Sequence, residues 1–196
     1  MKYDTNDTRQ HILNVGYQLA VAKGFTSVGL SELLKTADVP KGSFYHYFKS
    51  KEQFGEALIN DYFQHYLERV NHLFNHGEGD SLQRLMQYFT RWLEMENGTC
   101  NAHRCLVVKL SAEVSDLSEP MREALHKGAK QVINAIASCI ENGIQENVIA
   151  HQPSQVTANM LYQLWLGASL LSKLSQDTSG LQQTLVTTEQ LLRTEI

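Results

Sequence analysis

Residues 30–48 read LSELLKTADVPKGSFYHYF, and this stretch decides the fold of the N-terminal part of the chain. Leucine and alanine recur at helical spacing as far as Ala37, and Asp38-Val39-Pro40 then ends the pattern. Phe44 and Phe48, four residues apart, mark the hydrophobic face of a second short helix. The pattern predicts two short helices joined by a tight turn, the arrangement called a helix-turn-helix.

The second of these helices presents polar side chains on the face opposite its phenylalanines. They are hydrogen-bond donors that suit phosphate oxygens or base edges: Lys41, Ser43, Tyr45, His46 and Tyr47. Gly42 omits a side chain where the backbone would approach DNA closely, and Lys51 adds a cation near the start of the next helix. These residues predict a DNA-binding surface. The alternative is that the tyrosines belong to a core and the lysines to an ordinary solvated face.

The rest of the chain also has helical periodicity, and no run alternates in the way typical of strands. We expect an all-α fold with about nine helices, at residues 7–23, 29–37, 41–47, 50–75, 80–96, 103–114, 118–143, 154–175 and 180–193. In the first helix we expect one inward face, formed by Ile12, Val15, Leu19 and Ala22. The expected domains are a three-helix DNA-binding domain, residues 1–52, and a larger helical domain, residues 53–196.

The composition is that of a globular protein, with 42% hydrophobic and 19% charged residues among 196. Seven Lys and Arg against four Asp and Glu make residues 1–51 basic, whereas the remainder has ten against seventeen. No hydrophobic run approaches the roughly 18 residues that a membrane span requires, and the N-terminal sequence lacks a signal-peptide core. The three cysteines are too few for a disulfide scaffold. We therefore expect a cytoplasmic protein that does not contact a membrane.

The sequence VPKGSFYHYFKSKEQF, residues 39–54, resembles the DNA-binding signature of the TetR family of bacterial transcriptional regulators. The resemblance implies a homodimer that binds double-stranded operator DNA, with a C-terminal domain for sensing and dimerisation. It implies that Lys41, Gly42 and Ser43 lie at the major groove and that Tyr45, Tyr47 and Lys51 hold phosphates. The positions of Ser31 and His46 sometimes read bases in this family. Many members have two hydroxyl residues where this chain has Val28-Gly29, so phosphate contacts there are in doubt.

Cys105 is the candidate for a reactive group. It lies in the first turn of the helix expected at 103–114, where the helix dipole favours a thiolate, and Arg104 and Lys109 bring positive charge near it. A buried cysteine that acts as a small hydrophobic residue would fit the same pattern. Lys173 interrupts a hydrophobic helix, so it either extends to solvent at the helix end or points toward the thiol.

A second resemblance favours the reactive reading. Residues 105–119, CLVVKLSAEVSDLSE, resemble a subgroup of TetR repressors that respond to N-ethylmaleimide, quinones, aldehydes and hypochlorite. It implies that Cys105 is the sensor and that a reactive electrophile or oxidant is the inducer. The runner-up is a repressor that reversibly binds an apolar small molecule.

The sequence gives little support to a thiol-dependent enzyme. His103 is two residues from Cys105 and would point elsewhere on a helix, so it is not placed as a catalytic base. No metal-ligand or nucleotide-binding motif is present. We therefore expect neither enzymatic activity nor a bound metal or cofactor.

The last two predicted helices have hydrophobic stripes spaced by three and four residues. The stripes are formed by Met160, Leu164, Gly167, Leu171 and Leu174, and by Leu181, Leu185, Thr188 and Leu192. Such stripes suit helix packing, either within one subunit or between two. We expect a dimer interface here, because two DNA half-sites require two DNA-binding domains.

Overall fold

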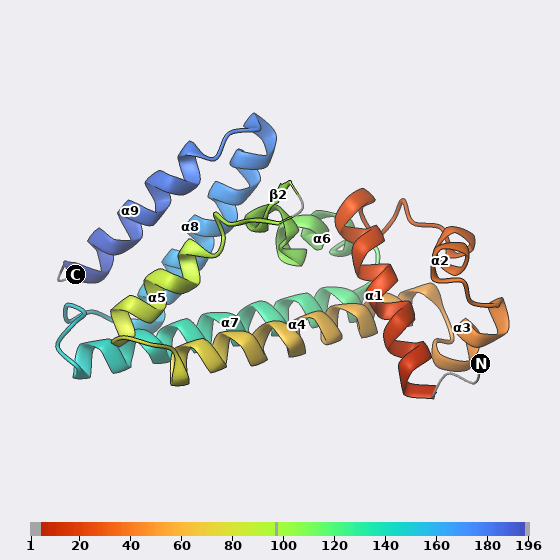
Figure 1. Ribbon diagram of the computed structural model, residues 1–196, viewed down its shortest axis with the longest axis horizontal. Helices are drawn as coiled ribbons and strands as arrows, with labels where there is room; N and C mark the ends of the chain where they lie inside the picture. Colours follow the sequence, from red (N-terminus) through yellow and green to blue (C-terminus); the bar gives the residue numbers. More distant parts are fainter. Residues whose placement is uncertain (1–4, 97, 195–196) are drawn as a thin grey trace. The chain divides into compact units, whose positions relative to one another are not determined.

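A computed structural model describes residues 5–96 and 98–194, and in these residues it contains nine α-helices (Figure 1). The elements are α1 Thr5–Lys23, α2 Leu30–Ala37, α3 Lys41–Tyr47, α4 Lys51–His76, α5 Ser81–Thr90, β1 Met95–Glu96, β2 Thr99–Cys100, the short 3₁₀ helix η1 Asn101–Arg104, α6 Leu106–Val114, α7 Glu119–Gln145, α8 Ser154–Ser175 and α9 Ser179–Arg193. The all-α prediction is confirmed. Residues 1–4, at the start of the expected DNA-binding domain, and residue 97, in an expected loop, lie outside the described residues.

The chain forms two compact units. One contains residues up to 65 together with 109–128, and the other contains 66–108 together with 129–196. Helices α4, α6 and α7 each contribute residues to both units. No helix in the described residues is both long and hydrophobic enough to cross a bilayer.

The first unit contains the predicted helix-turn-helix. Helix α2 ends at Asp38, which has a positive φ of 51° and donates its backbone N–H to the carbonyl oxygens of Leu34 and Lys35. The side chains of Phe44 and Phe48 are completely buried against Phe54 of α4, with ring centroids 5.6 and 5.2 Å from it. Packing of the two phenylalanines on Phe54 therefore holds α3 in place and leaves its opposite face exposed.

The inward face of α1 differs from the expected one. Ile12 is buried as expected, and Leu13 and Ala20 are buried with it, whereas Val15 and Leu19 are half-buried and Ala22 is exposed. Gly16 explains the difference, because its missing side chain allows α1 to approach α4. A Cβ added at Gly16 would lie 2.3 Å from the Phe54 ring.

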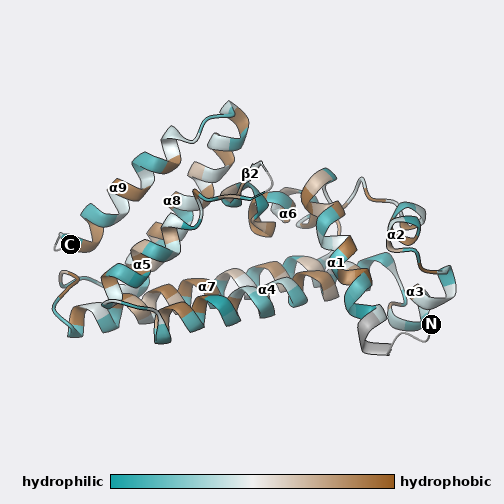
Figure 2. Ribbon diagram, in the orientation of Figure 1, coloured by the Kyte–Doolittle hydropathy of each residue, from teal (hydrophilic) through white to brown (hydrophobic). Residues whose placement is uncertain are grey.

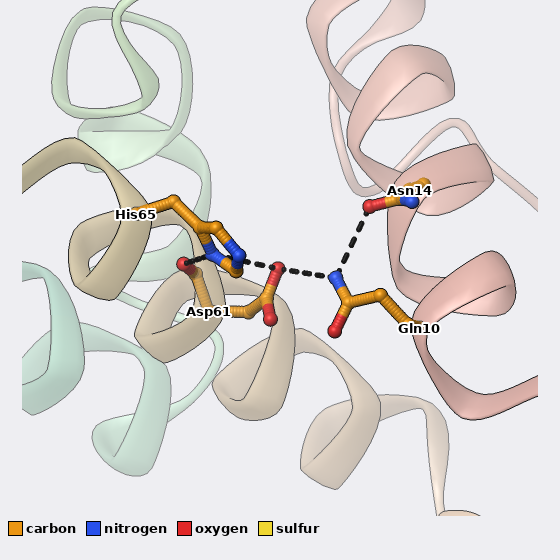
Figure 3. A network of polar contacts seen from close by, with 4 residues as sticks. All are labelled: Gln10, Asn14, Asp61 and His65. Carbon is orange, nitrogen blue, oxygen red and sulfur yellow. Dashed lines mark hydrogen bonds and ion pairs between the residues drawn. The ribbon is translucent and has the colours of Figure 1, made fainter. Parts of the chain in front are cut away.

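A polar network also fixes α1 to α4 (Figure 3). The side chain of Gln10 donates to the carboxylate of Asp61 at 3.0 Å and to Asn14 at 3.1 Å. On the other side of this carboxylate, His65 lies with its Nδ1 atom 3.8 Å from Asp61 Oδ2. The position of α1 is therefore set by hydrogen bonds as well as by packing.

Side chains cap the helix at two of the helix starts. Asp80 and Gln83 form a complete capping box at α5. At α4, the backbone N–H of Gln53 donates to Ser50 Oγ at 3.1 Å, and the Gln53 side chain accepts from the backbone of Lys49 at 2.7 Å. Both helices therefore begin where the sequence placed them.

In the second unit, α8 and α9 pack against each other, and hydrophobic residues recur along both (Figure 2). The indole ring of Trp165 stacks on Phe89 with centroids 5.0 Å apart, and its N–H donates to Thr188 Oγ1 at 2.9 Å. Stacked aromatic rings therefore form part of the core of this unit, and a buried hydrogen bond joins α8 to α9.

Two predictions between residues 80 and 114 are wrong. The helix expected at 80–96 ends at Thr90, and residues 95–96 pair with 99–100 in a short antiparallel ribbon. Gly98 has a φ of +76°, which suits a tight hairpin and not a helix. Cys105 is extended, with φ −61° and ψ 121°, and lies between η1 and α6. It therefore precedes the helix and is not in its first turn, because the 3₁₀ helix η1 ends at Arg104 and α6 begins only at Leu106.

Candidate DNA interface and sensor cysteine

The exposed face of α3 carries most of the predicted DNA-binding residues. Lys41, Gly42, Tyr45 and His46 are exposed, and Ser43 and Tyr47 on the same helix are half-buried. The side chain of Tyr45 is 47% exposed, which is unusual for a tyrosine beside an aromatic core. Lys41 Nζ lies 5.7 Å from the centre of its ring. The arrangement offers a cation, hydroxyl groups and an imidazole to a ligand in solution.

The start of α2 lies at the other end of the turn. Ser31 is exposed in the first turn, whereas Val28 is buried in the core. Gly29 is the N-cap residue of α2 and has no side-chain capping bond. Many family members have hydroxyl residues at positions 28 and 29. At position 28 burial explains the difference, because the Val28 side chain packs inside the unit.

Gly42 has no role in the packing of α3. A Cβ added there would meet no atom within 4 Å, and neither would one added at Gly29. The protein interior therefore gives no reason for a glycine at position 42.

Lys51 is less available than the sequence suggested. It is half-buried, its Nζ atom donates to the backbone carbonyl oxygen of Thr26 at 3.3 Å, and it lies 4.9 Å from the centre of the Phe25 ring. Burial lowers the pKa of Lys51, and attraction to Glu113 opposes this decrease. The ammonium group of Lys51 is therefore already engaged in contacts within the protein.

Cys105 is the one half-buried cysteine, since Cys100 and Cys139 are buried. No disulfide joins the three, all of which are described. The Cys100 thiol donates to the carbonyl oxygen of Trp92 at 3.0 Å. Burial raises the pKa of Cys139 to about 12. Of the three cysteines, Cys105 is therefore the most exposed residue.

The cations that the sequence placed beside Cys105 lie in three different surroundings. Arg104 is ion-paired with Glu96 of β1. Lys109 is half-buried on α6. Lys173 is half-buried near the C-terminal end of α8, where its neighbour Ser172 hydrogen-bonds His103 Nε2 at 3.2 Å. This last bond connects the segment before Cys105 to the end of α8.

Three tyrosines that the sequence did not assign to Cys105 are electrostatically coupled to it. The hydroxyl groups of Tyr66 and Tyr88 are 2.9 Å apart, and Tyr162 approaches from α8. Burial chiefly raises the pKa of all three phenols, and a negative charge on Cys105 raises them further. Neutral hydroxyl groups therefore lie near the sulfur. Their helical spacing is that of ordinary core residues, so nothing in the sequence distinguished Tyr66 or Tyr88.

The described residues contain no group of three or more His, Cys, Asp or Glu side chains arranged to hold a metal ion. They do contain a groove of about 570 Å³ along α8 and α9, lined by Leu164, Gly167, Leu171, Gly180 and Thr184 among others. Leu171 and Leu174 beside it are 64% and 81% exposed. A hydrophobic surface of this kind is typical of an interface with another chain.

Known proteins resemble this chain along most of its length. Residues 12–58 match the family described as bacterial regulatory proteins, tetR family, and residues 81–187 match the tetracyclin repressor-like C-terminal domain. The chain is 45% identical over 197 aligned positions to the HTH-type transcriptional repressor NemR of Escherichia coli (strain K12), covering 98% of both proteins. It is 34% identical to the transcriptional regulator AcuR of Cereibacter sphaeroides, over 87% of this chain and 78% of AcuR. The crystal structure of reduced E. coli NemR has a TM-score of 0.88 to it, covering 96% of this chain and 98% of that one.

Proposed function

Because the chain belongs to the TetR family of bacterial regulatory proteins, we propose that it is a transcriptional repressor that binds operator DNA as a homodimer and releases it when Cys105 reacts with an electrophile or oxidant. It is a regulator and not an enzyme. Residues 1–52 bind the DNA, and residues 53–196 sense the inducer and form the dimer. Since its partner is bacterial DNA, the protein acts in the cytoplasm.

The exposed face of α3 supports the DNA-binding part of this proposal. Lys41, Tyr45 and His46 project from a helix whose other face is completely buried, which is the geometry of a recognition helix in the major groove. Lys41→Ala should therefore lower operator affinity at least about tenfold without lowering the melting temperature. Lys35→Ala, an exposed lysine on α2, is the charge-matched control. Fluorescence anisotropy with the chain's own promoter measures both variants, and equal affinities would contradict the assignment.

The observation that carries the sensing part is the difference in exposure among the cysteines. Cys105 is half-buried next to tyrosine hydroxyl groups, whereas Cys100 and Cys139 are buried. The relative NemR is a transcriptional repressor, and its known crystal structure is that of the reduced form. Lys173, Arg104 and Lys109 are proposed to assist Cys105 by their positive charge.

The chemistry required of Cys105 is simple. With a maleimide or quinone, the thiolate sulfur forms a bond to an alkene carbon, the electron pair of the double bond moves toward the carbonyl oxygen, and water supplies a proton. With hypochlorous acid, the thiolate is oxidised to a sulfenic acid and chloride leaves. Both reactions remove the negative charge from the sulfur and add atoms in a tightly packed region. A preference of about 2.7 kcal/mol for the released state lowers the DNA-binding population about a hundredfold.

The test is operator release by single-cysteine variants. Cys105→Ser should bind operator like the wild type and remain bound after treatment with N-ethylmaleimide, a quinone or hypochlorite. Cys100→Ser and Cys139→Ser should still be released. If Cys105→Ser is released as readily as the wild type, the sensor is not Cys105. The alternative, reversible binding of an apolar molecule, has less support, because Phe89, Trp92 and Trp165 are buried and their rings contact one another.

A further inference from the structure

Glu113, near the end of α6, contacts the turn between α1 and α2. One of its carboxylate oxygens, Oε2, accepts two hydrogen bonds from Thr26, from the backbone N–H at 3.0 Å and from the hydroxyl group at 2.9 Å. Glu113 and Thr26 are 87 residues apart in the sequence, and both belong to the first compact unit. Hydrogen bonds to a carboxylate are about twice as strong as those between neutral groups. The turn that leads into α2 is therefore held by an α6 side chain.

Gly24 gives the turn a shape that accepts this carboxylate. It has a φ of +85°, which strains any other residue, and a Cβ added there would lie 2.3 Å from Glu113 Oε1. Both carboxylate oxygens therefore lie against the turn, one at Gly24 and the other at Thr26. A side chain longer than glycine's at position 24 would displace Glu113.

Lys51 contacts the same turn residue from α4. Its Nζ atom donates to the carbonyl oxygen of Thr26 at 3.3 Å. Thr26 therefore donates its backbone N–H and hydroxyl group to Glu113 and accepts a hydrogen bond from Lys51. Lys51 and Glu113 also attract each other. The resemblance to the TetR family implies that Lys51 holds a DNA phosphate, so Thr26 would join this part of the DNA-binding surface to α6.

Helix α6 begins at Leu106, directly after Cys105, and Glu113 is the eighth residue of this helix. We propose that Glu113 is the positioning residue through which α6 controls the DNA-binding helices, by its contact with Thr26. The proposal rests on the proposed function, because it requires that Cys105 starts the change and that α2 and α3 bind operator DNA. A shift of α6 pulls on Thr26 and so alters the entry to α2, whose second residue is Ser31.

Two substitutions distinguish the effect of the hydrogen bonds made by Glu113 from the effect of its negative charge. Glu113→Ala removes both hydrogen bonds to Thr26. Glu113→Gln keeps a neutral acceptor at the same place, with weaker hydrogen bonds. Asp116→Ala is the matched control, because Asp116 is an exposed acid three residues further along the chain. Thermal unfolding of each variant shows whether it is folded.

The experiment compares operator affinity before and after alkylation of Cys105 by N-ethylmaleimide, with mass spectrometry to count the adducts. For the wild type we expect a ratio in the range of about 5–150-fold, typical of coupling between two sites. Glu113→Ala should form the same adduct, but its ratio should fall below about threefold. Glu113→Gln should be intermediate, and Asp116→Ala should match the wild type.

Three results would overturn the proposal, and they have different meanings. If Glu113→Ala is alkylated and released like the wild type, the coupling does not pass through Glu113, and the proposed function stands. If Asp116→Ala loses release as Glu113→Ala does, the effect is one of net charge on the protein. If the wild type itself is alkylated at Cys105 and keeps its operator affinity, the proposed function fails and this proposal fails with it.

Discussion

Arg104, the residue next to Cys105, is ion-paired with Glu96 at the end of β1. The guanidinium group is mostly buried, with 19% of the Arg104 side chain exposed, whereas Glu96 is 58% exposed. The positive charge that the sequence assigned to the thiol is therefore largely compensated by a carboxylate. If Arg104 assists Cys105 as proposed, removing the carboxylate of Glu96 should change the reactivity of the thiol.

Glu96→Gln should make Cys105 more reactive. Without the carboxylate, the charge of Arg104 is uncompensated and favours the thiolate, which is the nucleophilic form. We expect the rate of alkylation by N-ethylmaleimide at pH 7 to rise about two- to fivefold. Stopped-flow measurements in a Cys100→Ser, Cys139→Ser background give this rate. Arg104→Ala should lower the rate, and a variant pair with unchanged rates would contradict the electrostatic role of Arg104.

Gly42→Ala tests whether α3 approaches DNA closely. A methyl group at this position meets nothing in the protein, and alanine favours a helix over glycine by up to about 1 kcal/mol. The melting temperature should therefore stay the same or rise, while operator affinity falls at least about tenfold because the methyl group meets the DNA backbone. Calorimetry and fluorescence anisotropy on the same sample test this. Unchanged operator affinity would remove Gly42 from the interface.

The surroundings of Gly42 and those of Cys105 could be predicted from the sequence to different degrees. The helix-turn-helix and the exposed face of α3 were predictable, because hydrophobic spacing and the turn at Asp38 are local properties. The pairing of residues 95–96 with 99–100 was not predicted, since Met95 and Glu96 continue a helical pattern and a two-residue strand has no periodicity of its own. Likewise, the helical pattern of residues 103–114 predicted that Cys105 lies inside a helix.

Contacts between residues that are far apart in the sequence could not be predicted from the sequence either. The pairing of Arg104 with Glu96 depends on the ribbon that brings them together. The contact of Glu113 with Thr26 joins residues from α6 and the turn after α1, and neither residue type is unusual at its position. Long-range contacts of exposed polar side chains leave no periodic signal, whereas the buried phenylalanines of α3 do.

Leu171→Glu should dissociate the proposed dimer. Leu171 is 64% exposed beside the groove along α8 and α9, so a carboxylate there costs little in a monomer but would be buried without a partner in the dimer. We expect a monomer at micromolar concentration with weak operator binding. Leu117→Glu is the control, because Leu117 is equally exposed at 64% and lies between α6 and α7. Sedimentation velocity distinguishes the two, and a dimeric Leu171→Glu would place the interface elsewhere.

Cys139 should be unreactive in the folded protein at neutral pH. Burial raises its pKa to about 12, so fewer than about one in ten thousand of these thiols are ionised at pH 7.5. N-ethylmaleimide should therefore label Cys105 in the native protein, and Cys139 only after unfolding. Peptide mapping after timed labelling checks this order, and rapid native labelling of Cys139 would contradict it.

The same raised pKa gives Cys139 a defined effect on stability. In the unfolded chain its thiol ionises near the ordinary value of 9.0, whereas in the folded protein it stays protonated up to about pH 12. Because the unfolded state loses its proton first, the free energy of unfolding falls as the pH rises through this window and is unaffected below it. Cys139→Ala removes this contribution. The difference in unfolding free energy between the wild type and Cys139→Ala, measured by urea denaturation, should therefore be constant below about pH 8 and should decrease steadily above pH 9. A constant difference up to pH 11 would show that the Cys139 thiol ionises as easily in the folded protein as in the unfolded chain.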